Sequence, residues 1–124
     1  MEETLISLLL ANSSLTAIVG NRIRPVDRPQ TDTLPSITIQ RIDGIREYLL
    51  SGPSGLVSSR VQIDCWGKTY TQSKITARAV ALALSGIKDP FQGCFLVDET
   101  DSSEDAEPNR IFRTRLDFQV LHNN

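Results

Sequence analysis

The stretch from Gly55 to Leu84 constrains the fold most, because a strand pattern there runs directly into a helix pattern. Up to Trp66, apolar and polar side chains alternate with a period of two, as in a strand that is buried on one face only. The apolar phase holds Val61, Ile63 and Cys65, and the polar phase holds Arg60, Gln62, Asp64 and Trp66. A tryptophan among charged side chains is typical of a surface that meets a partner, so the pattern indicates an assembly component more than an enzyme.

The alanine-rich segment after this strand predicts the main helix, from Tyr70 or Thr71 to Leu84, ended by Ser85 and Gly86. Helical spacing predicts a core-facing stripe of Ile75, Ala79 and Leu82, joined by Val80 and Ala83, with Lys74 and Arg78 outside it. A binding groove along this stripe is the alternative, and the pattern favours core packing.

The remaining segments predict two short helices and further strands. The helices are expected at Glu2–Ala11 and Leu15–Val19, the second capped by Ser13 or Ser14 and stopped by Gly20. Strands are expected at Arg22–Val26, Ser36–Leu49 with a bulge at Asp43–Gly44, Gly93–Glu99 and Arg110–His122, an irregular loop at Asp27–Pro35, and a turn at Ser51–Gly55.

This order predicts an α+β fold with two layers in residues 1–124, which form one domain. A mostly antiparallel sheet of four to five strands carries the helices on one face, and the hairpin from Ser36 to Trp66 projects beyond the body. No apolar run approaches the about 20 residues of a membrane span. The acidic start, Met1-Glu2-Glu3, is unlike a signal peptide, so we expect synthesis in the cytosol.

Charge is distributed unevenly along the chain, whose net charge is -2. Six of the 15 acidic residues lie in one segment without Lys or Arg: Asp98, Glu99, Asp101, Glu104, Asp105 and Glu107. The rest of the chain has 13 basic and 9 acidic residues, a balance too mild for a nucleic-acid-binding surface. The acidic segment is expected to be a solvated loop, or alternatively a contact for a basic partner.

Residues for catalysis or cofactor binding are scarce. Cys65 and Cys94 lack metal-ligand spacing and are expected to be free core thiols. His122 is the one histidine of the chain, and it continues a strand pattern. A serine or cysteine nucleophile would need a histidine as its general base, and there is no other histidine to supply one. We therefore expect no catalytic residues, no metal and no cofactor.

The polar phases of two strands are expected to share the uncovered face of the sheet. They hold Gln62, Asp64 and Trp66 on one strand and Arg113, Arg115, Asp117 and Gln119 on the other. This face is either solvated or a polar interface between subunits, and both alternatives stay open. The candidate partner-contacting loops are Ser51, Gly52, Pro53, Ser54 and Gly55, and the acidic Asp101, Glu104, Asp105 and Glu107.

Several ordered motifs resemble the tail completion proteins of long-tailed bacteriophages, also called tail terminators or tail-to-head joining proteins. The motifs are Leu8–Asn12, Ile18–Ile23, Pro25–Gln30, Leu34–Thr38, Gly52–Val57, Arg60–Trp66 and Arg113–Phe118, with the alanine-rich helix between the last two. The resemblance covers nearly the whole chain.

This resemblance implies a subunit of a hexameric ring in the virion, at the junction of tail and head. The ring would cap the tail tube protein and join it to the head connector or stopper protein. It would leave a channel through which DNA passes without sequence-specific binding. Isolated subunits could be monomeric, and no membrane is implied. The alternatives are another head–tail connector or neck protein, or a small ligand-binding or enzymatic α+β domain.

Overall fold

The computed structural model describes residues 2–25, 34–49, 52–87, 91, 93–106 and 109–123. In chain order the elements are α1 (Glu2–Leu10), α2 (Ser13–Val19), β1 (Ile23–Pro25), β2 (Ser36–Leu49), β3 (Gly52–Gly67), α3 (Tyr70–Leu84), β4 (Gly93–Ala106) and β5 (Asn109–Asn123). The predicted α+β class is confirmed. None of the described helices is long and apolar enough to cross a lipid bilayer.

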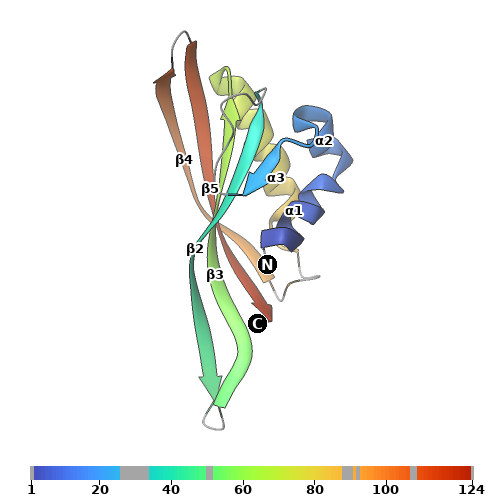
Figure 1. The fold of residues 1–124 in the computed structure, drawn as a ribbon, viewed down its shortest axis with the longest axis vertical. Coiled ribbons are helices and arrows are strands. Elements are labelled where there is room, and N and C mark those ends of the chain that lie inside the picture. Colours follow the sequence, from blue (N-terminus) through green and yellow to red (C-terminus); the bar gives the residue numbers. More distant parts are fainter. Residues whose placement is uncertain are drawn as a thin grey trace.

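The five strands form one sheet in the order β1-β2-β3-β5-β4. β1 pairs with β2 in parallel, and the other neighbouring strands are antiparallel. The helices lie together on one side of this sheet, and the two long hairpins extend toward opposite ends of the molecule (Figure 1). The other face of the sheet carries no helix and is called here the open face.

The core lies between the sheet and the helices, and the period-two prediction for β3 is confirmed. Val61, Ile63 and Cys65 are fully buried, as are the alternating residues Leu116, Phe118 and Val120 of β5. The helices contribute Leu5, Leu9, Leu15, Val19, Val80 and Leu84. Alternation along each strand therefore decides which side chains enter the core.

The stripe predicted to face the core on α3 is wrong at Ile75 and Leu82, whereas its Val80 is fully buried and its Ala79 and Ala83 pack against the core. Ile75 is 49% exposed and Leu82 is 80% exposed. The helix instead buries Ser73, Thr76, Ala77, Val80 and Leu84. Two of these, Ser73 and Thr76, are hydroxyl residues, which the predicted stripe did not include.

These hydroxyl groups can be buried because the helix itself provides their acceptors. Ser73 Oγ donates to the Tyr70 carbonyl at 2.8 Å, and Thr76 Oγ1 donates to the Gln72 carbonyl at 2.9 Å. A buried hydroxyl with a hydrogen bond costs far less than an orphaned one. Small side chains also let α3 approach the sheet closely, so a face of low hydrophobicity becomes the packed one.

The start of α3 lies against the end of β3, and Gly67 makes this approach possible. A Cβ atom at Gly67 would meet the Ser73 backbone nitrogen at 2.7 Å. The helix begins with Thr69 as its N-cap, whose side chain accepts a hydrogen bond from the Gln72 backbone nitrogen at 3.0 Å. The short turn from strand to helix is therefore fixed by one glycine and one cap.

Several boundaries differ from the sequence predictions. The N-cap of α2 is Asn12 rather than Ser13 or Ser14, because its side chain accepts from the Leu15 backbone nitrogen at 3.0 Å, while Gly20 ends the helix at φ 61° as expected. β1 begins at Ile23, one residue later than predicted, and the expected last residue, Val26, lies outside the described residues. The register of β2 with β3 shifts between Arg41 and Asp43, next to the expected bulge at Asp43–Gly44, and again between Arg46 and Tyr48.

Two segments predicted as turn or loop are strands. β3 begins at Gly52, which pairs with Leu49, so most of the turn expected at Ser51–Gly55 belongs to the ladder. The acidic segment continues β4 to Ala106, paired along its length with β5. Ser51, Glu107 and nearly all of the expected loop Asp27–Pro35 lie outside the described residues.

We predict that Gly67→Ala lowers the free energy of unfolding by about 1–3 kcal/mol, because the new methyl group must displace backbone rather than a flexible side chain. Denaturant unfolding of both proteins measures the difference. Gly44→Ala is the matched control: its Cβ would lie 3.4 Å from Ser59 Oγ, an ordinary contact, so its effect should stay within about 0.5 kcal/mol. Equal effects at the two positions would contradict this account of the turn.

Candidate functional site

The open face brings together all the polar residues that the sequence predicted to share it. In the register of β3 with β5, Trp66 lies opposite Arg113 and Asp64 lies opposite Arg115. The next pairs along the same face are Gln62 with Asp117 and Arg60 with Gln119. Antiparallel partners point to the same side of a sheet, so these residues form two adjoining rows.

The charges in these rows pair with one another. Arg115 Nε donates to Asp64 Oδ1 at 3.3 Å, and Gln62 Nε2 donates to Asp64 Oδ2 at 3.1 Å. With both carboxylate oxygens occupied, Asp64 is only 8% exposed. Arg60 Nη2 donates to Asp117 Oδ2 at 3.1 Å in the next row. Two of these pairs, Arg115 with Asp64 and Arg60 with Asp117, bring opposite charges together across the two strands.

The Trp66 side chain contacts residues of both neighbouring strands, β2 and β5. Its indole nitrogen donates to Thr38 Oγ1 on β2 at 3.1 Å, and the Arg113 guanidinium lies 5.2 Å from the centre of its ring. Arg113 Nε in turn donates to Ser102 Oγ on β4 at 3.1 Å. At the other end of the rows, the Gln119 side chain donates to Ser58 Oγ. The open face is therefore a rigid surface in which a half-buried tryptophan already has its polar atom satisfied.

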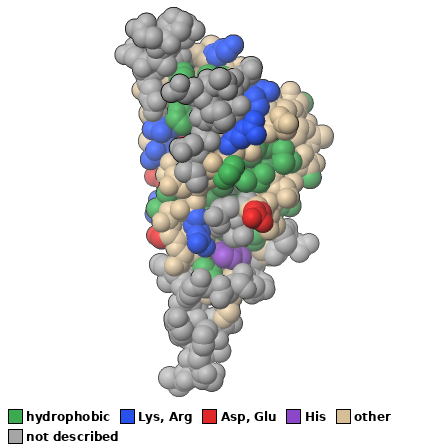
Figure 2. Space-filling view, in the orientation of Figure 1, with side chains coloured by type: hydrophobic (Ala, Val, Ile, Leu, Met, Phe, Trp, Pro, Cys, Tyr) green, Lys and Arg blue, Asp and Glu red, His purple; other side chains and the backbone are tan. Residues whose placement is uncertain are grey.

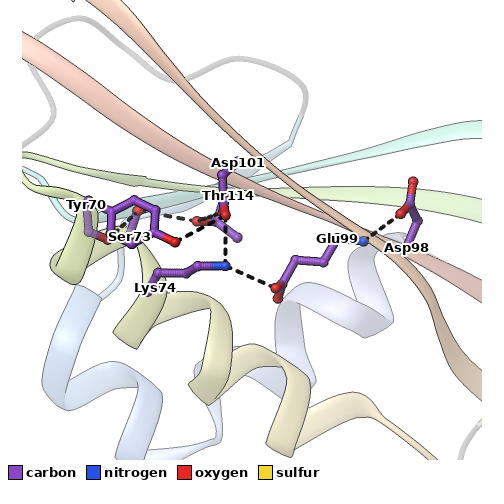
Figure 3. Close-up of polar contacts among 7 residues, drawn as sticks. All are labelled: Tyr70, Ser73, Lys74, Asp98, Glu99, Asp101 and Thr114. Atoms are coloured by element: carbon purple, nitrogen blue, oxygen red, sulfur yellow. Dashed lines mark hydrogen bonds and ion pairs between the residues drawn. The ribbon is translucent and has the colours of Figure 1, made fainter.

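Two residues of the acidic segment, Glu99 and Asp101, bind α3 of the same chain, and the described part of the segment is a strand instead of a loop. Lys74 Nζ lies 3.0 Å from Glu99 Oε2 and 3.0 Å from Asp101 Oδ2 (Figure 3). Asp101 also accepts hydrogen bonds from Thr114 Oγ1 at 3.0 Å and from the Tyr70 hydroxyl at 3.4 Å. This group, called here the β4 clasp, fastens the outermost strand to the helix layer. The sequence missed it because the partners are far apart in the chain.

The clasp shifts the ionisation of both partners toward the charged form. The Asp101 and Glu99 carboxylates raise the pKa of the Lys74 amine above its ordinary value, outweighing the opposing effect of burial. Burial alone would raise the pKa of Asp101, but hydrogen bonds from Lys74 and Thr114 hold it below its ordinary value. Asp98 points to the open face, opposite Asp117, and so does not share the clasp.

Groups suited to catalysis are buried or separated in the part of the chain that the structure describes. No cluster of three or more His, Cys, Asp and Glu side chains that could hold a metal ion occurs among the described residues. Cys65 and Cys94 are free and buried, and burial raises the pKa of Cys94 to about 11 and that of Cys65 further still. His122 Nε2 lies 2.8 Å from Ser59 Oγ, and both residues are buried at the end of the ladder.

A second surface is exposed on α3, and it includes Ile75 and Leu82, which were expected to face the core. Ile75, Arg78, Ala79 and Leu82 line the outer side of the helix, and with Ile18 of α2 they border a shallow groove. Hydrophobic side chains reach the surface on the side of the helices (Figure 2). The available signal was that α3 carries two apolar stripes, of which only one can face the sheet.

We predict that the β4 clasp weakens in acid. A carboxyl group whose pKa is lowered in the folded state adds stability above its unfolded pKa, and this contribution is lost as the pH falls through the folded value. Lys74, with its raised pKa, loses its contribution only as the pH rises through its folded value. Protection of β4 amides from hydrogen exchange should therefore exceed that in Asp101→Asn near neutral pH and converge with it in acid.

Asp98→Asn is the matched control for this measurement, since Asp98 lies on the same strand but on the other face. Its β4 amides should be protected as in the unaltered protein at every pH. If Asp101→Asn had no effect near neutral pH, the clasp would not hold β4.

Comparison with known proteins identifies the family. The family model described as "Tail completion protein gp17" matches residues 3–123. No curated protein matches the chain. Among solved structures, a chain in "Virion of native gene transfer agent (GTA) particle" has the same fold, with a TM-score of 0.77 and 17% sequence identity over 97% of this chain and 92% of that chain. Because the family model spans nearly its whole length, the chain belongs to the tail completion protein gp17 family, whose members are structural and not enzymatic, as its ordered motifs predicted.

Proposed function

We propose that this tail completion protein forms a closed ring at the head-proximal end of the tail, where it caps the tail tube and joins it to the head connector. The observation that carries the proposal is the direction of the two long hairpins, which project toward opposite ends of the molecule (Figure 1). A component that joins two others needs contact surfaces at both of its ends.

The register of the sheet accounts for these projections. β3 pairs with β5 from Leu56, opposite Asn123, to Gly67, opposite Phe112. Beyond Leu56 the β2–β3 hairpin continues alone to its tip, where Leu49 pairs with Gly52. Beyond Phe112 the β4–β5 hairpin continues alone in the other direction, to Ala106 opposite Asn109. The two tips therefore extend past the shared sheet and can reach neighbours above and below a ring.

The candidate contact residues follow this division. At one tip the described candidates are Gly52, Pro53, Ser54 and Gly55, and near the other tip they are Glu104 and Asp105, while the candidates Ser51 and Glu107 lie outside the described residues. The Asp101 carboxylate already forms an ion pair with Lys74 of the same chain, so we assign it to the β4 clasp before any contact with a partner. The uncharged tip and the acidic tip differ in chemistry, which suits the recognition of two different partners, the tail tube protein and the head connector or stopper protein.

The open face is the further contact surface that we propose. Trp66 with Arg113 is its anchor, since Trp and Arg are the residue types that dominate binding energy at protein interfaces. The other proposed contact residues are Gln62, Asp64, Arg115, Asp117 and Gln119. Their charges pair inside the sheet, and strong binding to DNA needs clustered unpaired Lys and Arg. A surface of this kind can lie near a DNA channel without holding the DNA.

The comparison structure supports the setting. It is a virion of a native gene transfer agent particle, and its matching chain shares this fold over nearly its whole length. We propose by analogy that this protein is also a component of a phage-like virion, at the junction of tail and head, made in the cytoplasm of the producing bacterium.

Particles made without this protein provide the test of its place in assembly. Electron microscopy should show tails of uncontrolled length that do not join filled heads, because the tube would lack its cap. Finished tails of normal length beside filled heads would instead assign the protein to another step in the neck. Normal particles carrying attached tails would overturn the proposal.

A substitution tests the open face as a contact surface. Trp66→Leu should lower the number of joined particles roughly tenfold or more, because it removes the aromatic anchor. Tyr70→Leu is the matched control, since Tyr70 is an aromatic residue with one side-chain hydrogen bond and a cation, Lys74, 5.7 Å from its ring. That variant should stay within about twofold of the unaltered protein, and equal losses would remove the open face from the proposal.

Arg115→Glu is unsuitable for this test. It would place a second carboxylate beside Asp64, whose side chain is 11% exposed, and so disturb folding as well as contact. Thermal unfolding of Trp66→Leu and Tyr70→Leu should show similar midpoints, which separates lost contact from lost stability.

A further inference from the structure

We propose that neighbouring subunits of the ring meet through two different surfaces, the outer stripe of α3 on one subunit and a corner of β4 on the next. The stripe consists of Ile75, Arg78, Ala79 and Leu82. The corner consists of Phe95, Val97 and Asp98. The occupant of the exposed stripe is thus a second copy of this chain, an inference that rests on the proposed ring.

The stripe consists of three apolar side chains that surround one cation, Arg78. Its residues have the spacing of successive turns on one side of a helix; Ile75, Arg78 and Leu82 are exposed, and Ala79 is partly buried at the edge of the core. Leu82 is 80% exposed and Ile75 is 49% exposed, while Ile18 and Ala83 extend the same groove below them. Single exposed apolar residues are ordinary, but a contiguous strip along a helix and an adjoining groove indicates a contact surface.

The corner owes its exposure to a register shift in the outermost strand. Between Leu96 and Asp98 the pairing of β4 with β5 is interrupted, and Val97 is the residue left over. Val97 and Phe95 are each 51% exposed. The Phe95 ring lies over Gly93, where a Cβ atom would approach it to 2.8 Å, so the aromatic side chain has a defined seat.

The charges of the two surfaces are complementary. Arg78 is exposed and has no acidic partner among the described side chains. Asp98 is exposed and binds only the Glu99 backbone nitrogen, at 2.9 Å, within the described part of the chain. Each charge stands beside exposed apolar side chains, so docking one surface on the other would bring Arg78 to Asp98 while Leu82 covers Val97 or Phe95.

The positions of the surfaces suit a closed ring. The stripe belongs to the helix layer, whereas Phe95 and Asp98 lie opposite Gln119 and Asp117 of the open face. Two unlike patches on different sides of one subunit make a heterologous contact, and repeated heterologous contacts close into a ring when the rotation allows. A groove that met its own copy would give a two-fold dimer instead.

Charge reversal and its repair test the pairing. Arg78→Glu and Asp98→Arg should each raise the concentration for half-maximal assembly at least about tenfold, because like charges then face each other. The double variant Arg78→Glu with Asp98→Arg should return it to within about threefold of the unaltered protein. Lys68→Glu, the reversal of an exposed cation off the stripe, is the matched control and should change little. Sedimentation velocity over a concentration series gives these values.

Cross-linking makes the same contact visible on the free protein and on purified particles. With Leu82→Cys and Val97→Cys in one chain, oxidation should join subunits into a ladder of covalent oligomers that ends at the ring. Lys68→Cys with Val97→Cys should give no such ladder. Rings that form without this cross-link, or that ignore the charge reversals, would overturn the pairing and leave the ring proposal intact. A chain that forms no ring, alone or in particles, would overturn both.

A different occupant of the stripe gives its own result. If a tail or neck protein covered it, Leu82→Ser would release that protein from particles while rings of this chain persisted, which would also overturn the proposal. Leu10→Ser, at a 41% exposed leucine on α1, controls for the loss of a surface apolar side chain.

Discussion

The pairing of β3 with β5 is the constraint on which the rest of the structure depends. These two strands pair antiparallel from Leu56 to Gly67, and along most of each strand buried residues alternate with partly exposed ones. One set of side chains supplies the floor of the core, and the other set builds the paired rows of the open face. A slip by one residue would exchange the two sets, burying Arg115 and Asp117 and exposing Leu116 and Phe118. Register therefore fixes core and surface together.

This coupling explains which features could be predicted from the sequence. The alternation of Val61, Ile63 and Cys65 with polar neighbours is a local signal, so the two faces and the residues gathered on the open face were predictable. The stripe of α3 was not, because the choice between two possible faces depends on Ser73 and Thr76 finding acceptors in their own helix. Hydrophobicity alone ranks Ile75 and Leu82 higher than the residues that are buried. Packing of α3 against the sheet therefore overrides the preference that its hydrophobic pattern alone would indicate.

The acidic segment shows a second way in which distant contacts override local composition. Charged residues without apolar partners favour a loop, and an isolated hairpin is marginally stable in water. Here Lys74, on a helix that comes earlier in the chain, binds Glu99 and Asp101, and Thr114 on the neighbouring strand binds Asp101 as well. A cation from the helix layer thus gives the acidic strand the partners that its own sequence lacks. No pattern within residues 98–107 contains this information.

The protein has two kinds of charged surface, which differ in whether their charges are paired within the chain. Asp64 and Asp117 on the open face, and Glu99 and Asp101 in the clasp, are bound to arginine or lysine of the same chain. Those groups fix the shape of the subunit, and they offer a partner a rigid surface with little charge left over. Arg78 and Asp98 differ, since neither has an opposite charge among the described residues and both stand beside exposed apolar side chains. In a structural protein, such charged residues can give specificity for a neighbouring subunit, because each finds an opposite charge only when that neighbour is present.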